Sequence, residues 1–574
     1  MNIFEKYLNI LNNLILKNQK YLNLKNLNEF KGVIVEIPPS DFDYHLSCNI
    51  CLVLGKINKM DPKNLAAEVK DLVKKNLKEF NETEIAGPGF LNFKLSNNAL
   101  IKNINEILKN RKTYGKKASN YNYNIEFVSA NPTGPMHVGH CRGAIYGDVL
   151  ANLLKFNGNK VTKEYYINDY GSQIFNFTKS VFLRIREIKY KEKFVNKNDL
   201  YPGQYIIEIS KKIIDTNKKE EFNSFENSFD LIKKESLKYS MDLIKSDLKD
   251  LGINHDNFFS ETELIKNKLV EKAVNQLKKD KHISYGYLEP PKGEIDKNWK
   301  KTKRLIFKST LFGDDTDRAI QKNDGSWTYF ANDIAYHMNK VERKYDYLIN
   351  VLGADHTGYI KRITAAVTAL SSNKVKLNCK VCQLVKLFKN GEPFKMSKRA
   401  GDFISARDLL NEVNKDSLRF MMLNRSNDVE LDFDFNKVLE KNKDNPVFYV
   451  QYSFARISSI FRTLNKSLEE EILINTKEFE MNDFEIKIAK KIFEWPKIVE
   501  TASTKYEPHR IPYYLYELAT LFHSYWSKGN EDQEYKIIVN GKIKNLGTLI
   551  TMVLISIVLQ RGMNILGVSL PNKM

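Results

Sequence analysis

The sequence has few cysteines and no long uninterrupted apolar segment. Five cysteines in 574 residues are too few for the disulfide framework of a small secreted domain. The most apolar run, Leu546 to Leu559, is shorter than the roughly 20 residues that a bilayer-spanning helix needs, so we expect a buried helix in a bundle. The first 20 residues lack the apolar core of a signal peptide. The sequence therefore predicts a soluble, cytoplasmic protein.

The composition also excludes wholesale disorder and a fibrous repeat. Hydrophobic residues make up 42% of the chain and charged residues 28%, as in ordinary globular proteins, and no internal repeat is evident. At roughly 100–200 residues per domain, the length predicts three or four domains. The 90 Lys and Arg residues exceed the 70 Asp and Glu residues, so the formal net charge is +20. This excess favours a polyanionic partner such as nucleic acid, although a Lys-rich drift of the whole proteome would produce it too.

Two cysteine pairs have the CxxC spacing of zinc sites and redox motifs. Cys48 and Cys51 lie in an apolar stretch typical of a buried helix, and Cys379 and Cys382 lie in a stretch that alternates like a strand. No His or Cys knuckle flanks either pair at metal-site spacing. We therefore expect structural cysteines and no protein-bound zinc or other metal.

The centre of the chain has the order strand, turn, helix, strand. The run NIEFVSA, residues 124–130, predicts a strand that leads into a turn with two prolines and two glycines. A helix predicted from Val138 to Phe156 follows, and the run KVTKEYYIND, residues 160–169, predicts a second strand. This order is typical of a βαβ unit in a parallel sheet.

The flanking regions have different patterns. The N-terminal hundred residues combine helical spacing with one short strand, and Lys109 to Asn124 read as a linker. Further strand-like runs occur at Tyr345 to Gly353 and at Val381 to Phe388. The predicted fold class is α/β, with a Rossmann-like parallel-sheet domain at 111–444, a Lys-rich helical insertion without strand signals at about 175–300, a small α+β domain at 1–110 and an all-α domain at 445–574.

Two short motifs, HVGH at 137–140 and KMSK at 395–398, are suited to ATP chemistry. HVGH lies where the first strand leads into its helix, which is where parallel sheets bind nucleotides. Its two imidazoles can donate hydrogen bonds to an α-phosphate, and its glycine lets an adenine ring lie against the backbone. The two KMSK ammonium groups can stabilise charge on a leaving pyrophosphate. Each motif alone is a weak signal, but the two in this order are specific.

The motifs resemble the HIGH and KMSK signatures of class I aminoacyl-tRNA synthetases. The surrounding sequences resemble bacterial arginyl-tRNA synthetases in particular, as in EFVSANPTGPMHVGHCRGAIYGD, STLFGDDTDRAIQKNDGSWTYFANDIAYH, NVLGADHTGYIKR and NPVFYVQYSFARISSIFR. The likeness runs from about residue 87 to the C-terminal LGVSLPNKM. It implies an enzyme that activates L-arginine with ATP and transfers it to tRNA(Arg), releasing AMP and pyrophosphate. It also implies a monomer with an anticodon-binding C-terminal domain.

The resemblance assigns roles to individual residues of the two substrate sites. An arginine site needs carboxylates placed for a planar guanidinium group. The residues implied for arginine are Glu126 and Asp333 for the guanidinium, Tyr329 to order it, Ser129 and Asn131 for the α-amino end, and His356 as pocket lining. The residues implied for ATP are His137, Gly139, His140, Asp355, Lys395, Met396, Ser397 and Lys398, of which His137, His140, Lys395 and Lys398 are catalytic. Mg²⁺ is expected to arrive on the triphosphate.

The implied tRNA contacts lie at the two ends of the chain. They are Phe90 and Asn92 in GPGFLNF for the D-loop, and Tyr449, Tyr452 and Arg456 in FYVQYSFAR for the anticodon. Aromatic side chains at helical spacing can stack on splayed bases, but Phe448 and Phe454 could equally be core residues.

Three other readings stay open at this point. A different HxGH adenylyltransferase would be much shorter and would lack the helical C-terminal region. A different class I synthetase, such as a cysteinyl-type enzyme, would need zinc ligands near its amino-acid pocket. A non-catalytic tRNA-binding paralogue would keep the fold without turnover.

Overall fold

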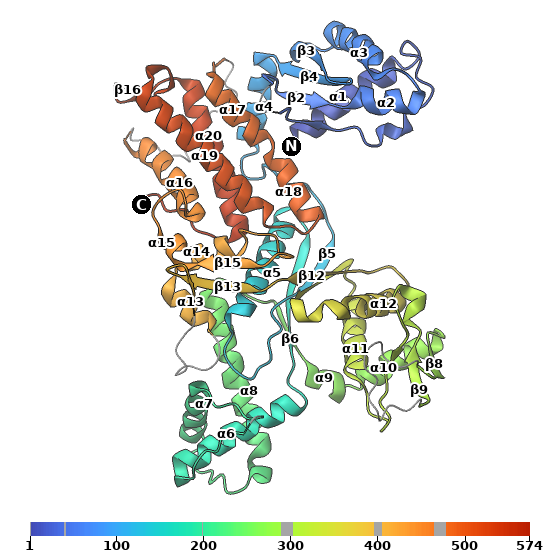
Figure 1. Cartoon of the computed structure of the whole chain (residues 1–574), viewed down its shortest axis with the longest axis vertical. Helices are drawn as coiled ribbons and strands as arrows, with labels where there is room; N and C mark the ends of the chain where they lie inside the picture. The colour runs from blue at the N-terminus through green and yellow to red at the C-terminus, as the bar shows by residue number, and fades with distance from the viewer. Residues whose placement is uncertain (1, 40–41, 198, 289–301, 395–403, 464–477) are drawn as a thin grey trace.

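The structure is a computed structural model that describes residues 2–39, 42–197, 199–288, 302–394, 404–463 and 478–574. The molecule is elongated, with the N-terminal domain and the C-terminal helices at one end and the helices α6 (Ser172–Tyr190), α7 (Gln204–Thr216) and α8 (Phe225–Asp250) at the other (Figure 1). The HVGH motif lies at the start of the helix α5 (Val138–Phe156), which packs on the sheet between these ends.

The central sheet has five parallel strands in the order β12-β11-β5-β6-β7. The strands are β5 (Asn122–Glu126), β6 (Lys160–Ile167), β7 (Asn257–Ser260), β11 (Tyr347–Gly353) and β12 (Lys376–Cys382). Helix α5 (Val138–Phe156) joins β5 to β6, which confirms the predicted βαβ unit. The helix packs tightly on the sheet, because a Cβ at Gly147 would lie 2.3 Å from the ring of Phe127.

The N-terminal domain is α+β, as predicted. Its four-stranded antiparallel sheet has the order β1-β2-β4-β3. The elements are α1 (Ile3–Lys17), β1 (Val35–Glu36), β2 (Leu46–Cys48), α2 (Ile50–Asn58), α3 (Pro62–Asn76), β3 (Phe80–Ala86), β4 (Phe90–Leu95) and α4 (Asn97–Lys109).

The region predicted as purely helical is divided by the sheet. Helices α6 (Ser172–Tyr190), α7 (Gln204–Thr216) and α8 (Phe225–Asp250) form a unit with its own apolar core. The chain then returns to the central sheet as β7, which pairs with β6. The prediction of no strand here is therefore wrong, since β7 and β8 (Ile283–Gly286) both lie in this stretch. Each has only four residues, too few for a clear alternation among Lys-rich helices.

A second small sheet follows, in the order β10-β9-β8. It shares an apolar core with the helices around it. The elements of this part are α9 (Glu261–Lys266), α10 (Leu269–Lys279), β9 (Arg304–Phe307), β10 (Arg318–Ala319), α11 (Tyr329–Glu342) and α12 (Ile360–Ser371). Helix α11 reaches from this core to the central sheet, where it positions several charged side chains.

The strand predicted at Val381 to Phe388 is two strands. β12 ends at Cys382, and β13 (Val385–Lys389) belongs to another sheet, with β14 (Glu392–Pro393) and β15 (Leu431–Asp434). The helices that follow are α13 (Ala406–Glu412), α14 (Lys415–Met422), α15 (Phe435–Leu439), α16 (Pro446–Thr463), α17 (Asp483–Phe493), α18 (Trp495–Thr504), α19 (Arg510–Glu531) and α20 (Leu546–Leu566). A two-stranded hairpin, β16 (Ile538–Val539) with β17 (Lys542–Ile543), interrupts this helical region. The domain predicted as all-α at 445–574 is therefore mainly helical, with strands too short to be recognised in the sequence.

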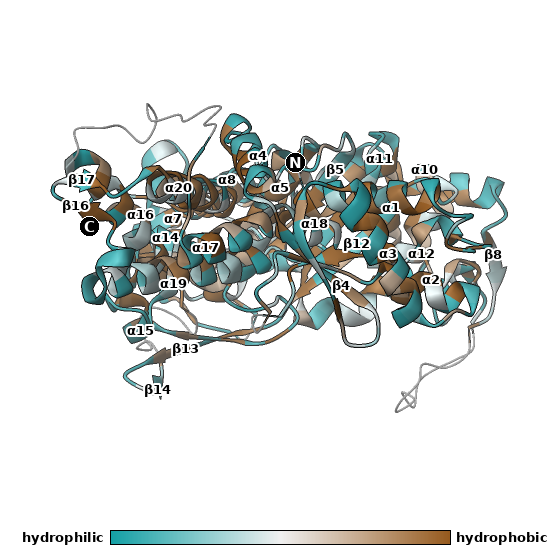
Figure 2. Cartoon of the chain, turned by 90° about the horizontal axis from the view of Figure 1, so that it is seen from above, coloured by the Kyte–Doolittle hydropathy of each residue, from teal (hydrophilic) through white to brown (hydrophobic). Residues whose placement is uncertain are grey.

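Helix α20 is the most apolar helix of the C-terminal bundle. Its 21 residues exceed the predicted run, so by length and composition it could cross a membrane. However, 83% of its apolar window is buried inside the protein, which identifies it as the core helix that we expected. Its hydrophobic colouring in Figure 2 extends along much of the helix.

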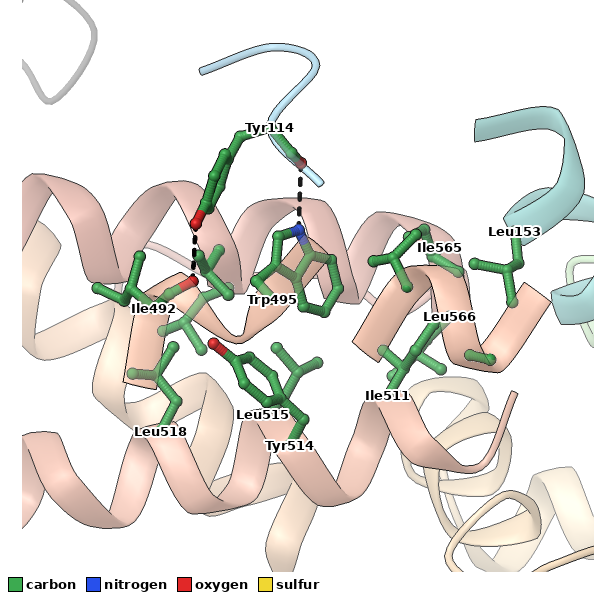
Figure 3. Packing of buried hydrophobic residues seen from close by; sticks show 14 of the residues in the cluster. Tyr114, Leu153, Ile492, Trp495, Ile511, Tyr514, Leu515, Leu518, Ile565 and Leu566 are labelled. Carbon is green, nitrogen blue, oxygen red and sulfur yellow. Dashed lines mark hydrogen bonds between the residues drawn. The ribbon is translucent and has the colours of Figure 1, made fainter. Parts of the chain in front are cut away.

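The segment predicted as a linker, Lys109 to Asn124, packs against the C-terminal bundle through Tyr114. The Tyr114 hydroxyl donates a hydrogen bond to the Ile492 carbonyl oxygen at 2.8 Å, and the Trp495 indole donates to the Tyr114 carbonyl oxygen at 3.1 Å (Figure 3). Gly115 has a φ of 91°, and a Cβ there would lie 2.3 Å from the Trp495 indole nitrogen. This segment is therefore a fixed part of the core and does not act as a free connection.

Candidate active site

The HVGH motif forms the N-terminus of α5, close to the end of β5. His137 is the N-cap residue, and its Nδ1 accepts a hydrogen bond from the Gly139 backbone N–H at 3.1 Å. The His137 backbone N–H donates to Nδ1 of His140 at 3.3 Å, and the two ring centroids lie 3.7 Å apart. Burial lowers the pKa of His137, and burial together with the His137 ring lowers the pKa of His140 to about 3.

These hydrogen bonds determine which ring nitrogen carries the proton. Both rings are neutral at physiological pH, and both accept through Nδ1, so the proton is assigned to Nε2. Each imidazole can thus donate a hydrogen bond through its Nε2–H group. Two N–H donors at a helix N-terminus suit an anionic group such as a phosphate.

The chain that follows KMSK returns to the HVGH segment. The Val138 backbone N–H donates to the Ile404 carbonyl oxygen at 2.9 Å, and the Ala406 N–H donates to the Met136 carbonyl oxygen at 2.8 Å. His137 and Ser405 form an antiparallel bridge between these two hydrogen bonds. The predicted residues Lys395, Met396, Ser397 and Lys398 lie outside the described residues, but Ile404 joins their end of the chain to the predicted ATP site.

Glu126 ends β5 and is held by two neighbours. The Ser129 hydroxyl donates to its Oε1 at 3.1 Å, and the Lys340 ammonium group on α11 pairs with its Oε2. Val128 and Ser129 have φ values of 72° and 41°, in the left-handed region that a β-branched residue rarely adopts. This strained turn directs the Ser129 hydroxyl back toward Glu126, and such strain is concentrated at functional sites.

Asp333 lies in the first turns of α11 and has a strongly raised pKa. Removal from water raises the pKa of this carboxyl group to about 7. The hydrogen bond from the Tyr359 hydroxyl and the charge of Lys340 lower it, whereas the charges of Glu126 and Glu261 raise it. A titratable group of this kind is typical of a functional site.

Glu261, on α9, adds another buried carboxyl group beside Asp333. Burial raises the pKa of Glu261, and its Oε1 accepts a hydrogen bond from the Asn332 side chain at 3.1 Å. Nothing in the local sequence pattern identified Glu261, Tyr359 or Lys340 as site residues. Tyr359 lies within the stretch NVLGADHTGYIKR, which drew attention only to its aspartate and histidine.

The remaining predicted arginine-site residues are distributed around this centre. Asn131 hydrogen bonds through its amide to Gln173 at 2.8 Å and to Asn168 at 3.2 Å. Tyr329 begins α11 but is 72% exposed, and the hydroxyl that contacts Asp333 is that of Tyr359. Tyr329 and Asp333 both belong to α11, four residues apart. The role of Tyr329 toward a substrate stays a prediction.

Asp355 and His356 lie directly after the end of β11. Their side chains are 79% and 59% exposed, and the His356 Nε2 lies 3.4 Å from an oxygen of Asp355. They occupy the short 3-10 helix η3 (Ala354–Tyr359), at the carboxyl edge of the sheet where nucleotides bind.

The predicted tRNA contacts differ in their accessibility. Asn92 is only 2% exposed in β4, so it offers almost no surface to an RNA, whereas Phe90 is half-buried. In α16, Arg456 donates to the Tyr452 hydroxyl at 2.9 Å and stacks between the Tyr452 and Trp526 rings, 4.4 and 4.9 Å from their centroids. Tyr449 packs on His523 with ring centroids 4.1 Å apart. Of the two open cases, Phe454 is a core residue and Phe448 is half-buried.

The CxxC pairs are largely shielded from water. Burial raises the pKa of Cys48, Cys379 and Cys382 each to about 12, so these thiols are protonated at neutral pH. Within the described ranges, no group of three or more His, Cys, Asp or Glu side chains could hold a metal ion.

Comparisons with known proteins cover the whole chain. Residues 103–461 match the family described as tRNA synthetases class I (R), catalytic domain, residues 9–95 match the arginyl tRNA synthetase N terminal domain, and residues 450–574 match the DALR anticodon binding domain. An arginine–tRNA ligase of Pelagibacter ubique is 54% identical over 580 residues, which is 100% of both chains, and one of Brucella canis is 42% identical over 550 residues, 94% of each.

A solved structure is also similar to most of this chain. An arginyl-tRNA synthetase structure from Campylobacter jejuni has a TM-score of 0.72 at 31% identity and covers 84% of this chain and 100% of its own. The catalytic family match spans more than half of the chain, and the N-terminal and C-terminal matches flank it in the expected order. The chain therefore belongs to the arginyl-tRNA synthetases, a family of class I aminoacyl-tRNA synthetases that use ATP.

Proposed function

We propose that this protein is an arginine–tRNA ligase. It activates L-arginine with ATP to arginyl-adenylate and transfers the arginyl group to the 3′-terminal adenosine of tRNA(Arg), releasing AMP and pyrophosphate. It acts as a monomer in the cytoplasm. The observation that carries the proposal is the group of carboxylates at the end of β5 and the start of α11, beside the HVGH helix.

The charge balance of this pocket favours a cationic substrate. The charges of Glu126 and Glu261 both act on Asp333, and Lys340 is the cation paired with Glu126. Among the described residues around Asp333, one ammonium group is therefore set against three carboxyl groups, and a cationic side chain would reduce this excess of negative charge. A guanidinium group is planar and donates paired hydrogen bonds, which suits carboxylates approaching from two elements.

The other end of the amino acid and the nucleotide occupy neighbouring positions in this proposal. Asn131, with Ser129, holds the α-amino group, and His356 lines the pocket. The Nε2–H groups of His137 and His140 donate to the α-phosphate, the backbone at Gly139 carries the adenine, and Asp355 lies on the ribose side. Lys395 and Lys398, with Met396 and Ser397 between them, stabilise the leaving pyrophosphate, and Mg²⁺ is bound by the triphosphate itself.

The reaction then proceeds in two displacements. The arginine carboxylate attacks the α-phosphorus, and the bond to the pyrophosphate breaks. A hydroxyl of the terminal adenosine next attacks the carbonyl carbon, and AMP leaves. The protein supplies positioning and charge stabilisation and no covalent nucleophile. Phe90 and the α16 residues Tyr449, Tyr452 and Arg456 contact the tRNA.

Aminoacylation of mixed tRNA with each of the twenty amino acids tests the proposal. We expect arginine alone to be charged, in an ATP-dependent reaction. Charging with another amino acid would identify a different class I synthetase. Binding of tRNA without any ATP–pyrophosphate exchange, in the presence of arginine and tRNA, would identify a non-catalytic paralogue.

A further inference from the structure

A row of polar residues crosses all five strands of the central sheet beneath the pocket. In register, Cys379 of β12 lies beside Asn350 of β11, Asn350 beside Glu126 of β5, Glu126 beside Glu164 of β6, and Glu164 beside Asn257 of β7. Residues paired in this way point to the same face of a sheet. A continuous polar row inside an α/β protein is unusual, since buried parallel strands are normally apolar.

Helix α11 lies over this row and provides its cations. Arg343 pairs with Glu164, which also accepts hydrogen bonds from the Tyr336 hydroxyl at 2.7 Å and the Asn257 amide at 2.8 Å. Lys340 pairs with Glu126 and donates to the Asn350 side-chain oxygen at 3.2 Å. The Lys340 side chain is 0% exposed, and its ammonium group lies 4.4 Å from the centroid of the Tyr336 ring. Burial of such a charge is tolerated only with these partners.

Glu126 and Asp333 are consequently not equivalent. Both carboxylate oxygens of Glu126 already have protein partners, the Ser129 hydroxyl and the Lys340 ammonium group. Asp333 accepts a hydrogen bond from the neutral Tyr359 hydroxyl, and no cation of the described residues lies within ion-pair distance of it. Of these two carboxylates, the one whose negative charge a substrate can neutralise is therefore Asp333.

We propose that Lys340 is a positioning residue of the arginine pocket. Its buried ammonium group fixes and neutralises the Glu126 carboxylate, so that the incoming guanidinium neutralises Asp333. The inference rests on the proposed arginine–tRNA ligase function and extends it to a residue that does not touch the substrate.

The other titratable groups around Lys340 do not compete for this role. Glu164, on β6, is neutralised by Arg343. The pKa of Glu164 is lowered to about 2, because the charges of Arg343 and Lys340 and its hydrogen bonds outweigh the effect of burial. Burial lowers the pKa of His337, on α11, to about 3 and raises that of Cys379, on β12, to about 12, so both are uncharged. Burial also raises the pKa of Tyr336. Lys340 is thus balanced by Glu126 and, through space, by Asp333.

The test compares Lys340→Met with the wild-type enzyme in steady-state aminoacylation. We expect the KM for arginine to rise about tenfold or more, with the KM values for ATP and tRNA within about twofold of wild type. The acid limb of kcat/KM for arginine should move to higher pH, because the positive charge that lowers the pKa of Asp333 is lost. In a Glu126→Gln background, Lys340→Met should raise the arginine KM by much less, since the two residues act as a pair.

Lys272→Met is the matched control. Lys272, on α10, makes an exposed ion pair at 2.7 Å with Glu342, which lies on α11 like Lys340. We expect it to behave as wild type. Lys340→Gln keeps a donor for Glu126 and replaces the Met variant if that variant does not fold. An unchanged arginine KM, an equal rise in all three KM values, or an unmoved acid limb would overturn the inference. Failure of the wild-type enzyme to charge arginine would instead overturn the proposed function.

Discussion

The raised pKa of Asp333 predicts an unusual pH dependence of arginine use. An ordinary aspartate with a pKa near 3.8 stays ionised throughout the physiological range, whereas Asp333 takes up a proton at about pH 7. Only the ionised carboxylate can pair with a guanidinium group. Arginine recognition by the free enzyme should therefore weaken as the pH falls through this value.

The size of the effect follows from the titration. With a pKa of about 7, about nine-tenths of the Asp333 side chains are ionised at pH 8 and about one-tenth at pH 6. kcat/KM for arginine should thus fall about tenfold between these pH values. kcat should change less, because bound arginine stabilises the ionised form. The two HVGH imidazoles do not contribute to this limb, since burial holds their pKa values below the usual range.

Initial rates of aminoacylation at saturating ATP and tRNA, across about pH 5.5 to 8.5, measure this dependence. Two variants shift the midpoint in opposite directions. Glu261→Gln removes a like charge and should move the midpoint down, whereas Tyr359→Phe removes a hydrogen bond to the carboxylate and should move it up. A kcat/KM for arginine that stays constant from pH 6 to pH 8 in the wild-type enzyme would refute the reasoning.

Four further predictions concern single substitutions. Asp333→Asn should raise the thermal stability of the arginine-free enzyme more at pH 8 than at pH 5, because the folded protein favours the protonated acid and loses stability as the pH rises from about 4 to 7. It should also weaken arginine recognition, on the order of 2–5 kcal/mol in kcat/KM. Lys398→Ala should lower kcat more than it raises the arginine KM in aminoacylation, since its contacts matter most in the transition state; an effect on arginine binding alone would contradict the assignment of the loop. Gly147→Ala places a Cβ 2.3 Å from a buried ring and should reduce stability in urea unfolding by about 1–3 kcal/mol. Tyr452→Ala should raise the KM for tRNA by the equivalent of about 1–3 kcal/mol without changing that for ATP, whereas the 62% exposed Tyr21→Ala serves as the control.

Much of the fold could be predicted because its signals are local. The sequence predicts the β5–α5–β6 unit with α5 beginning at Val138 and ending at Phe156, since a Pro- and Gly-rich turn precedes the helix and Asn157-Gly158 follows it. The strands β7 and β8 were missed because four residues cannot show an alternation. Tyr114 was assigned to a linker because nothing in a Lys-rich segment indicates that one side chain inserts into a distant bundle.

The site was predictable only where a sequence motif marked it. Glu126 and Asp333 were chosen from such motifs, and the structure shows that their charges act on each other. Lys340 was not found, because its partner Glu126 lies 214 residues away in the sequence and the pairing depends on the registry of α11 over the sheet. Arg343 and Glu164 were missed for the same reason, being 179 residues apart.

The anchoring of Tyr114 bears on how this enzyme could be divided into fragments. A fragment that begins at β5 would omit the tyrosine and leave an empty space beside Trp495, between helices that otherwise pack as one bundle. A fragment that begins a few residues earlier would keep the space filled. The useful cut between the N-terminal domain and the rest therefore lies just after α4, which ends at Lys109, ahead of the glycine-containing turn.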